Sequence, residues 1–309
     1  MSKVDLITIL GPTASGKTKL ACHLAKKIGG EIISADSRQI YQGMDIGTGK
    51  DLDEYIVEKE MINYHLIDIK PAGYKYNIEE FQQDFRAAYQ LIRENDHLPI
   101  LCGGSGLYIE TALGGGTYLG IPSAKDTVLE MEAWTDEQLE LRYMNCLPKV
   151  KANLNAKTKQ RKMRAIEIDT FLKNNPDWKP TRPLHLKPLI IGIEIDRDER
   201  RKKISDRLSY RMNHGLIEEV KRLIEQGLTY DDLDYYGLEY KWVGQYLQKK
   251  ITKRELFEGL STAIHQFAKK QMTWFRRMEK RGYPIHWLSS SNSVVLNVDS
   301  ILDLIQEKA

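Results

Sequence analysis

A run of small and polar residues near the start of the chain has the spacing of a phosphate-binding loop. The sequence GPTASGKT fits the pattern G-x-x-x-x-G-K-[ST], with Gly11, Gly16, Lys17 and Thr18 at its fixed positions. In such a loop, backbone N–H groups and the lysine bind a phosphate chain, and the threonine hydroxyl offers a ligand to Mg²⁺. We therefore predict that a phosphorylated substrate binds here.

A second candidate group is the carboxylate of Asp36, which follows the short apolar stretch GEIIS. Open α/β sheets bind their ligands at the carboxyl ends of strands. Asp36 could be a magnesium ligand, a substrate-binding acid or a general base, or it could simply form an Asx turn. Nucleotide-hydrolysing enzymes usually supply another aspartate after a further apolar strand, but the stretch LCGGSG ends without an acid. This pattern favours group transfer to a small acceptor over hydrolysis.

Basic residues gather in two stretches far from this loop. Residues 265–281 (HQFAKKQMTWFRRMEKR) mix cations with aromatic residues, and residues 157–164 (KTKQRKMR) form a second cluster. Each stretch is either the solvated face of an amphipathic helix or a contact surface for nucleic-acid phosphates, because nucleic-acid affinity is largely electrostatic. Two basic helices beside one phosphate loop favour a nucleic-acid substrate. One arginine of residues 196–212 is also expected near the phosphates.

Alternating strand and helix patterns must position these groups. Apolar stretches predict strands at 4–10, 30–34, 98–104, 187–196 and 284–289. Helical periodicity predicts helices at 17–28, 77–94 and 105–113 and through most of 197–281, with a loop at 227–240. This order is typical of an α/β fold with a parallel sheet. The stretch 116–183 has polar helical patterns and no buried strand.

We therefore predict an α/β fold, a P-loop NTPase-like parallel sheet with a helical insertion and a helical C-terminal part. The catalytic core would begin with residues 1–115, and the insertion would span 116–183. Residues 184–309 would supply the returning strand and the helical C-terminal part of the core.

The composition excludes few classes of protein. The net charge of +3 gives no argument for nucleic acid from the molecule as a whole. The three cysteines are far apart in the sequence, which predicts neither a disulfide framework nor a zinc site and suits a reducing compartment. No apolar run approaches the length of a membrane span. We expect a cytoplasmic protein with no membrane partner.

Several segments together resemble the tRNA dimethylallyltransferase family. In order, they are GPTASGKT, ISADSRQIYQGMDIGTGK, GGSGLYIETAL, QRKMRAIEI and QFAKKQMTWFRR, and the resemblance as a whole extends from residue 6 to about residue 290. The resemblance implies transfer of a dimethylallyl group from dimethylallyl diphosphate to N6 of adenosine 37, next to the anticodon, in tRNAs that read codons beginning with U. It also implies Mg²⁺ as cofactor, the anticodon stem-loop of tRNA as partner and a monomeric enzyme.

The resemblance implies roles for individual residues. Asp36 would accept the proton of the adenine amine, while Lys17, Thr18 with its magnesium ion, and Arg207 would stabilise the departing diphosphate. The diphosphate-binding residues would be Gly11, Pro12, Thr13, Ala14, Ser15, Gly16, Lys17, Thr18 and Arg207. The tRNA-binding residues would be Asp36, Ser37, Arg38, Gln39, Ser105, Gln160, Arg161, Lys162, Met163 and Arg164.

Three features depart from the family pattern, and alternatives remain open. The insertion is shorter than usual, Glu239 stands where glycine is expected, and Ser105 replaces a threonine. A phosphate-loop kinase of a small metabolite or nucleoside would share the loop, but not the basic helices. A prenyltransferase acting on a free adenine nucleotide would not need the helical insertion. A non-catalytic RNA-binding protein would not need Lys17, Thr18 and Asp36.

Overall fold

The computed structural model describes residues 4–115, 118, 120–154, 156–179 and 184–308. The chain divides into two compact units. The first comprises the chain up to Gly114 and from Leu184 onward, and the second is Gly115–Pro183. No helix among the described residues is long and apolar enough to cross a bilayer.

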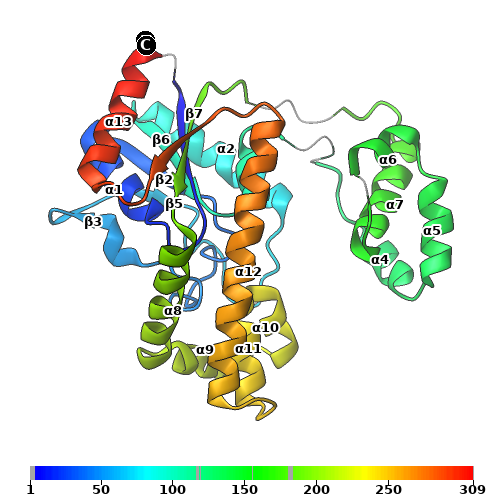
Figure 1. Ribbon diagram of the computed structural model, residues 1–309. Helices are drawn as coiled ribbons and strands as arrows, with labels where there is room; N and C mark the ends of the chain where they lie inside the picture. The colour runs from blue at the N-terminus through cyan, green and yellow to red at the C-terminus, as the bar shows by residue number, and fades with distance from the viewer. Residues whose placement is uncertain (1–3, 116–117, 119, 155, 180–183, 309) are drawn as a thin grey trace. The chain divides into compact units, whose positions relative to one another are not determined.

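A six-stranded parallel sheet forms the centre of the first unit (Figure 1). Its strand order is β5-β2-β6-β1-β7-β8, and every neighbouring pair is parallel. The strands are β1 (Leu6–Leu10), β2 (Gly30–Ser34), β5 (Tyr64–His65), β6 (Leu98–Gly103), β7 (Pro188–Glu194) and β8 (Ile285–Ser289). The central strands are apolar and buried, as is typical when helices cover both faces. The predicted α/β class is confirmed, and β5 is the strand of this sheet that the sequence did not predict.

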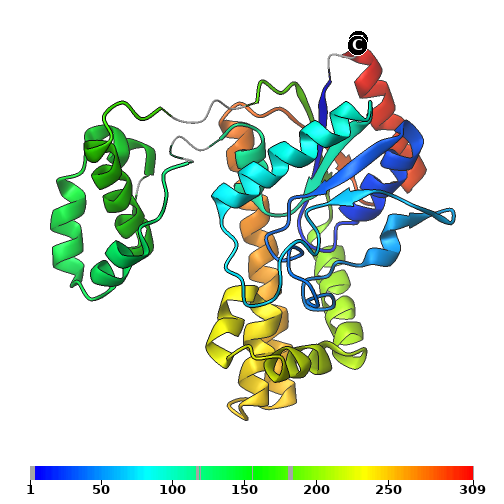
Figure 2. The same cartoon turned by 180° about the vertical axis from the view of Figure 1, so that it is seen from behind.

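Helices cover the two faces of the sheet. On β1, Leu6 and Leu10 pack in one hydrophobic cluster, whereas Ile7 and Ile9 pack in another. The first cluster includes α2 (Ile78–Glu94) and α3 (Gly106–Ala112), and the second includes α1 (Lys17–Ile28) and α13 (Val294–Glu307). Figure 2 shows the cyan helix α2 across the sheet on the side facing the viewer. A short helix η1 (Leu52–Tyr55) and a hairpin of β3 (Ile56–Val57) and β4 (Glu60–Met61) precede β5.

A group of helices follows β7. These are α8 (Arg197–Asn213), α9 (Leu216–Glu225), α10 (Tyr230–Tyr236), α11 (Leu238–Leu247) and the long α12 (Lys253–Lys280). The prediction of a loop at 227–240 is wrong, because α10 and the start of α11 occupy most of this segment. Thr229 and Asp232 cap each other's backbone N–H groups at the start of α10, and Leu233, Tyr236 and Tyr240 are buried. Capping and burial therefore favour helix over loop.

The second unit has its own small core. Its helices are α4 (Lys125–Glu132), α5 (Asp136–Met144), α6 (Pro148–Leu154) and α7 (Lys159–Asn174). Helix α7 is central, because Ala165, Ile166, Ile168 and Leu172 are buried against the other helices. Within the predicted insertion, residues 116–117, 119, 155 and 180–183 lie outside the described residues.

Candidate active site

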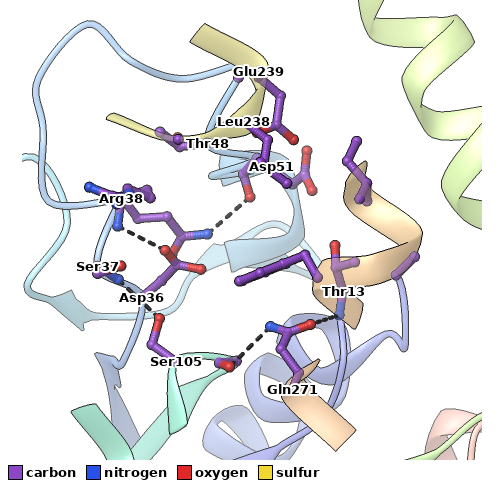
Figure 3. Close-up of a pocket in the computed structure, with 18 of the residues that line it drawn as sticks. Thr13, Asp36, Ser37, Arg38, Thr48, Asp51, Ser105, Leu238, Glu239 and Gln271 are labelled. Atoms are coloured by element: carbon purple, nitrogen blue, oxygen red, sulfur yellow. Dashed lines mark hydrogen bonds between the residues drawn. The ribbon is translucent and has the colours of Figure 1, made fainter. Parts of the chain in front are cut away.

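A cavity of about 860 Å³ lies at the carboxyl ends of β1, β2 and β6 (Figure 3). One wall is formed by residues that follow these strands, from 13–18, 36–39 and 104–108. Residues of α8, α10, α11 and α12, with Gly237 and the segment 47–54, complete it, and all lining residues belong to the first unit. Open α/β sheets bind their ligands at this edge.

The phosphate loop owes its shape to two glycines. Gly16 adopts φ 81° and is the N-cap of α1, so the loop ends at a helix N-terminus, which favours anions. A Cβ added to Gly11 would lie 2.6 Å from Oγ of Ser15, so no side chain fits there without displacing Ser15. Among the predicted diphosphate-binding residues of the loop, Gly11, Pro12 and Ser15 do not line the cavity. The lining residues are Thr13, Ala14, Gly16, Lys17 and Thr18.

Arg207 on α8 reaches this loop from the opposite wall. Its Nη2 donates to Oγ1 of Thr13 at 2.5 Å. The pKa of Arg207 is lowered to about 10, first by burial and then by the positive charge of Arg211. Burial also lowers the pKa of Lys17. The structure thus brings Lys17 and Arg207 into one cavity, where a bound anion would relieve the cost of burying positive charge.

Asp36 and Ser105 lie side by side at the ends of β2 and β6. The Oδ1 of Asp36 accepts from N of Arg38 at 2.9 Å, so the Asx turn exists, and yet this residue also lines the cavity. The N of Ser37 donates to Oγ of Ser105 at 3.3 Å. The dashed lines in Figure 3 mark both bonds. Arg38 and Gln39 line the same part of the cavity.

Four further carboxylates line the cavity, those of Asp51, Glu54, Asp234 and Glu239. The pKa values of Glu54 and Glu239 are raised, in both cases first by burial. Glu239 belongs to α11, so its backbone is helical and does not require the glycine that the family pattern suggests. Asp51 and Glu54 follow no strand, which is why the strand-end pattern that identified Asp36 did not identify them.

An apolar part of the cavity comes from α3 and α12. Leu107, Ile264, Phe267 and Trp274 line it. The Nε1 of Trp274 donates to Oε2 of the nearly buried Glu110 at 2.9 Å, which fixes the indole ring. The basic stretch 265–281, for which the sequence predicts either a solvated helix face or a nucleic-acid contact, belongs almost entirely to α12. In α12, Phe275 is buried in the core, while Lys270 lies on the cavity wall.

The predicted tRNA-binding residues 160–164 lie on α7 in the second unit. Met163 is 5% exposed and packs in that unit's core. Lys162 forms an ion pair with Glu140, and Arg164 donates to O of Ile121 at 2.5 Å. Gln160 and Arg161 are exposed. This segment therefore combines residues that hold the unit together with residues that are open to a partner.

The chain matches models of known protein families over most of its length. A family described as IPP transferase matches residues 39–278, and one described as isopentenyl transferase matches residues 4–68. A Bacteroides fragilis protein named tRNA dimethylallyltransferase 2 is 47% identical over 308 residues, which cover 100% of this chain and 99% of the relative.

Solved structures are similar over nearly the whole chain. The crystal structure of a tRNA isopentenylpyrophosphate transferase from Bacillus halodurans matches with a TM-score of 0.70 at 30% identity, over 98% of this chain and 97% of that one. A eukaryotic dimethylallyltransferase acting on tRNA matches with a TM-score of 0.81 at 20% identity, over 99% of this chain and 80% of that one. This second likeness concerns the fold.

Proposed function

The chain belongs to the IPP transferase family, and from this premise we propose that it acts as a tRNA dimethylallyltransferase. It transfers the dimethylallyl group of dimethylallyl diphosphate to N6 of adenosine 37, next to the anticodon, in tRNAs that read codons beginning with U. The observation that carries this proposal is that one cavity contains both the phosphate loop with Arg207 and the carboxylate of Asp36.

The two halves of the cavity fit the two halves of the reaction. The N6 amine attacks the allylic carbon, the C–O bond to the diphosphate breaks, and the diphosphate leaves with the electron pair. Lys17, Arg207 and the loop N–H groups would stabilise the charge that develops on the leaving oxygen. Asp36 would accept the proton of the amine, which is weakly nucleophilic because it is conjugated with the purine ring.

The residues present suit a magnesium ion. Thr18 lies on the cavity wall next to Lys17, with Asp51 and Glu54 on the same cavity surface. Mg²⁺ binds oxygen ligands and usually takes one or two from the protein, with the rest from substrate phosphates and water. We propose that the hydroxyl of Thr18 is its protein ligand, and the ion would neutralise diphosphate charge.

The remaining parts of the site suit the other substrate groups. Leu107, Phe267 and Trp274 offer an apolar surface to the prenyl group. The target adenine must leave its stack to reach a cavity of this kind, as bases do in other enzymes that modify them. Ser37, Arg38, Gln39 and Ser105 would contact the tRNA around that base, and the second unit, through residues such as Arg161, would bind the anticodon stem-loop.

Incubation with dimethylallyl diphosphate, Mg²⁺ and unmodified tRNA, followed by mass analysis of the nucleosides, tests the proposal. We expect N6-(dimethylallyl)adenosine in the digest. Parallel reactions with adenosine monophosphate as acceptor and with labelled ATP as donor separate the alternatives. Prenylation of the free nucleotide without tRNA modification, or phosphoryl transfer to any acceptor, would contradict it.

We also propose that the enzyme acts as a monomer in the cytoplasm. One chain supplies the phosphate loop, Arg207 and Asp36, which are the groups that the proposed reaction uses. Light scattering of the protein with and without tRNA would measure the number of copies in the active complex.

A further inference from the structure

Asp51 lies between two arginines of α8. Its Oδ1 and Oδ2 accept from Nη2 of Arg211 at 3.1 and 3.2 Å. Its Oδ2 also lies 3.6 Å from Nη1 of Arg207, whose Nη2 donates to Thr13 in the phosphate loop. The contacts therefore run from Arg211 through Asp51 and Arg207 to Thr13.

The segment around Asp51 is shaped to place its carboxylate. Asp51 adopts φ 44°, a left-handed conformation that residues other than glycine rarely adopt. Gly49 is also left-handed, and a Cβ added there would lie 2.3 Å from Nη2 of Arg211, so the guanidinium packs against this backbone. The Nε2 of Gln39 donates to O of Gly49 at 3.0 Å. This bond connects the segment around Asp51 to the part of the cavity that Asp36 lines.

Two roles for this carboxylate predict opposite effects on donor binding. The Asp51 carboxylate could compete with the diphosphate for the guanidinium of Arg207. Alternatively, it could hold that guanidinium in the orientation in which it binds the diphosphate. The distances favour the second role. Arg207 lies closer to Thr13 (2.5 Å) than to Asp51 (3.6 Å). Because the guanidinium is planar and rigid, a carboxylate at one edge fixes the direction of the other.

We propose that Asp51 is a positioning residue for the diphosphate: anchored by Arg211, it holds Arg207 against the phosphate loop. The side chain of Arg211 is 8% exposed and that of Asp51 is 41% exposed, so the nearly buried cation anchors the more exposed carboxylate. This inference rests on the proposed function. It also connects the segment that contains Asp51 to the site where the diphosphate leaves.

The test compares Asp51→Asn with the control Asp53→Asn, since Asp53 is exposed and does not line the cavity. Calorimetry would measure the affinity for magnesium pyrophosphate, and steady-state assays would measure KM for dimethylallyl diphosphate and kcat. We expect Asp51→Asn to weaken pyrophosphate binding and raise KM by about fivefold, the upper end of the scale for a partly exposed ion pair. Affinity for tRNA and the melting temperature should match those of the control.

A double-mutant cycle keeps the proposal testable if one variant loses stability. Arg211→Met should weaken pyrophosphate binding as much as Asp51→Asn does, and the double variant should be no worse than either, because both changes break one connection. Unchanged or tighter pyrophosphate binding in Asp51→Asn would overturn the inference, as would additive losses in the cycle. If the parent protein itself neither binds pyrophosphate nor prenylates tRNA, the proposed function is at fault.

Discussion

The side-chain Oε1 of Gln271 accepts a hydrogen bond from the backbone N of Thr13 at 2.9 Å, across 258 positions of the sequence. The Nε2 of the same amide donates to O of Gly104 at 3.0 Å. One buried side chain of α12 thus joins the phosphate loop to the end of β6. The amide fits both groups because it offers one acceptor and two donors.

Replacing Gln271 by leucine should loosen the phosphate loop. Both bonds would be lost, and a buried C=O and a partly buried N–H would be left without this partner, which costs about 1–3 kcal/mol for a fully buried group. We expect KM for dimethylallyl diphosphate to rise by about tenfold, with a smaller change in kcat. Gln266→Leu, at an exposed position of the same helix, is the matched control. Equal donor affinity in the two variants would argue against the anchoring role.

Replacing Asp36 by asparagine should separate binding from chemistry. Asparagine has nearly the same shape, and its Oδ1 can still accept from N of Arg38, so the turn should survive. It cannot take a proton from the adenine amine. We expect kcat to fall by about a hundredfold or more, the usual effect of losing a general base, while tRNA affinity stays close to that of the parent. Prenyl transfer near the parental rate would rule out Asp36 as the base.

Glu219 on α9 should be a major stabiliser of the segment that leads to Asp51. This carboxylate is 1% exposed and accepts from N of Asp45 at 2.9 Å, N of Ile46 at 2.8 Å and N of Gly47 at 3.0 Å. It also accepts from the hydroxyl of Tyr240 at 2.8 Å. Charge-assisted bonds of this kind are stronger than neutral ones.

Glu219→Gln would place an NH₂ group among these donors. We expect it to lower the free energy of unfolding by about 2–4 kcal/mol, within the range for breaking a buried polar network. Urea denaturation would measure the difference from the parent. The neighbouring Glu218→Gln should have little effect because Glu218 is exposed. If the two variants unfold at the same urea concentration, the hydrogen bonds that Glu219 accepts contribute nothing to stability.

Acid should weaken the second unit through Asp169. Burial opposes ionisation of this fully buried carboxyl, but bonds from Lys173 and from N of Leu147 outweigh it, so its pKa is lowered. When folding lowers the pKa of a carboxyl group below its unfolded value of about 3.9, the ionised group stabilises the folded state fully at pH values above about 3.9. That stability is lost as the pH falls through the folded pKa.

Asp169→Asn should therefore destabilise the second unit at neutral pH and reduce its acid sensitivity. Because Lys173 and Arg142 are partly exposed, we expect a loss of about 1–2 kcal/mol. Hydrogen exchange of the α7 amides at several pH values would measure it. Asp177→Asn, at an exposed position of the same unit, is the control. Parallel pH profiles for Asp169→Asn and the parent would show that the carboxylate has no such role.

The sequence predicted features that depend on local patterns. The sheet and the phosphate loop follow from apolar stretches and a fixed spacing, and Asp36 was identified because it directly follows a strand. Arg207 could be selected among its neighbours only by resemblance to a family. Gln271 was missed because its partners lie far away in the chain. Met163 illustrates the same limit, since a residue in a basic segment turns out to be buried.

Strand β1 lies between β6 and β7 in the sheet, although β7 follows the second unit in the chain. During synthesis, one edge of β1 therefore stays unpaired until residues 188–194 have been made. An unpaired strand edge can form hydrogen bonds with other chains. The second unit is continuous in sequence and can fold as soon as it leaves the ribosome. A ribosome that pauses between β6 and β7 would hold a sheet in which one edge of β1 is unpaired, so the nascent chain is exposed to aggregation during this interval.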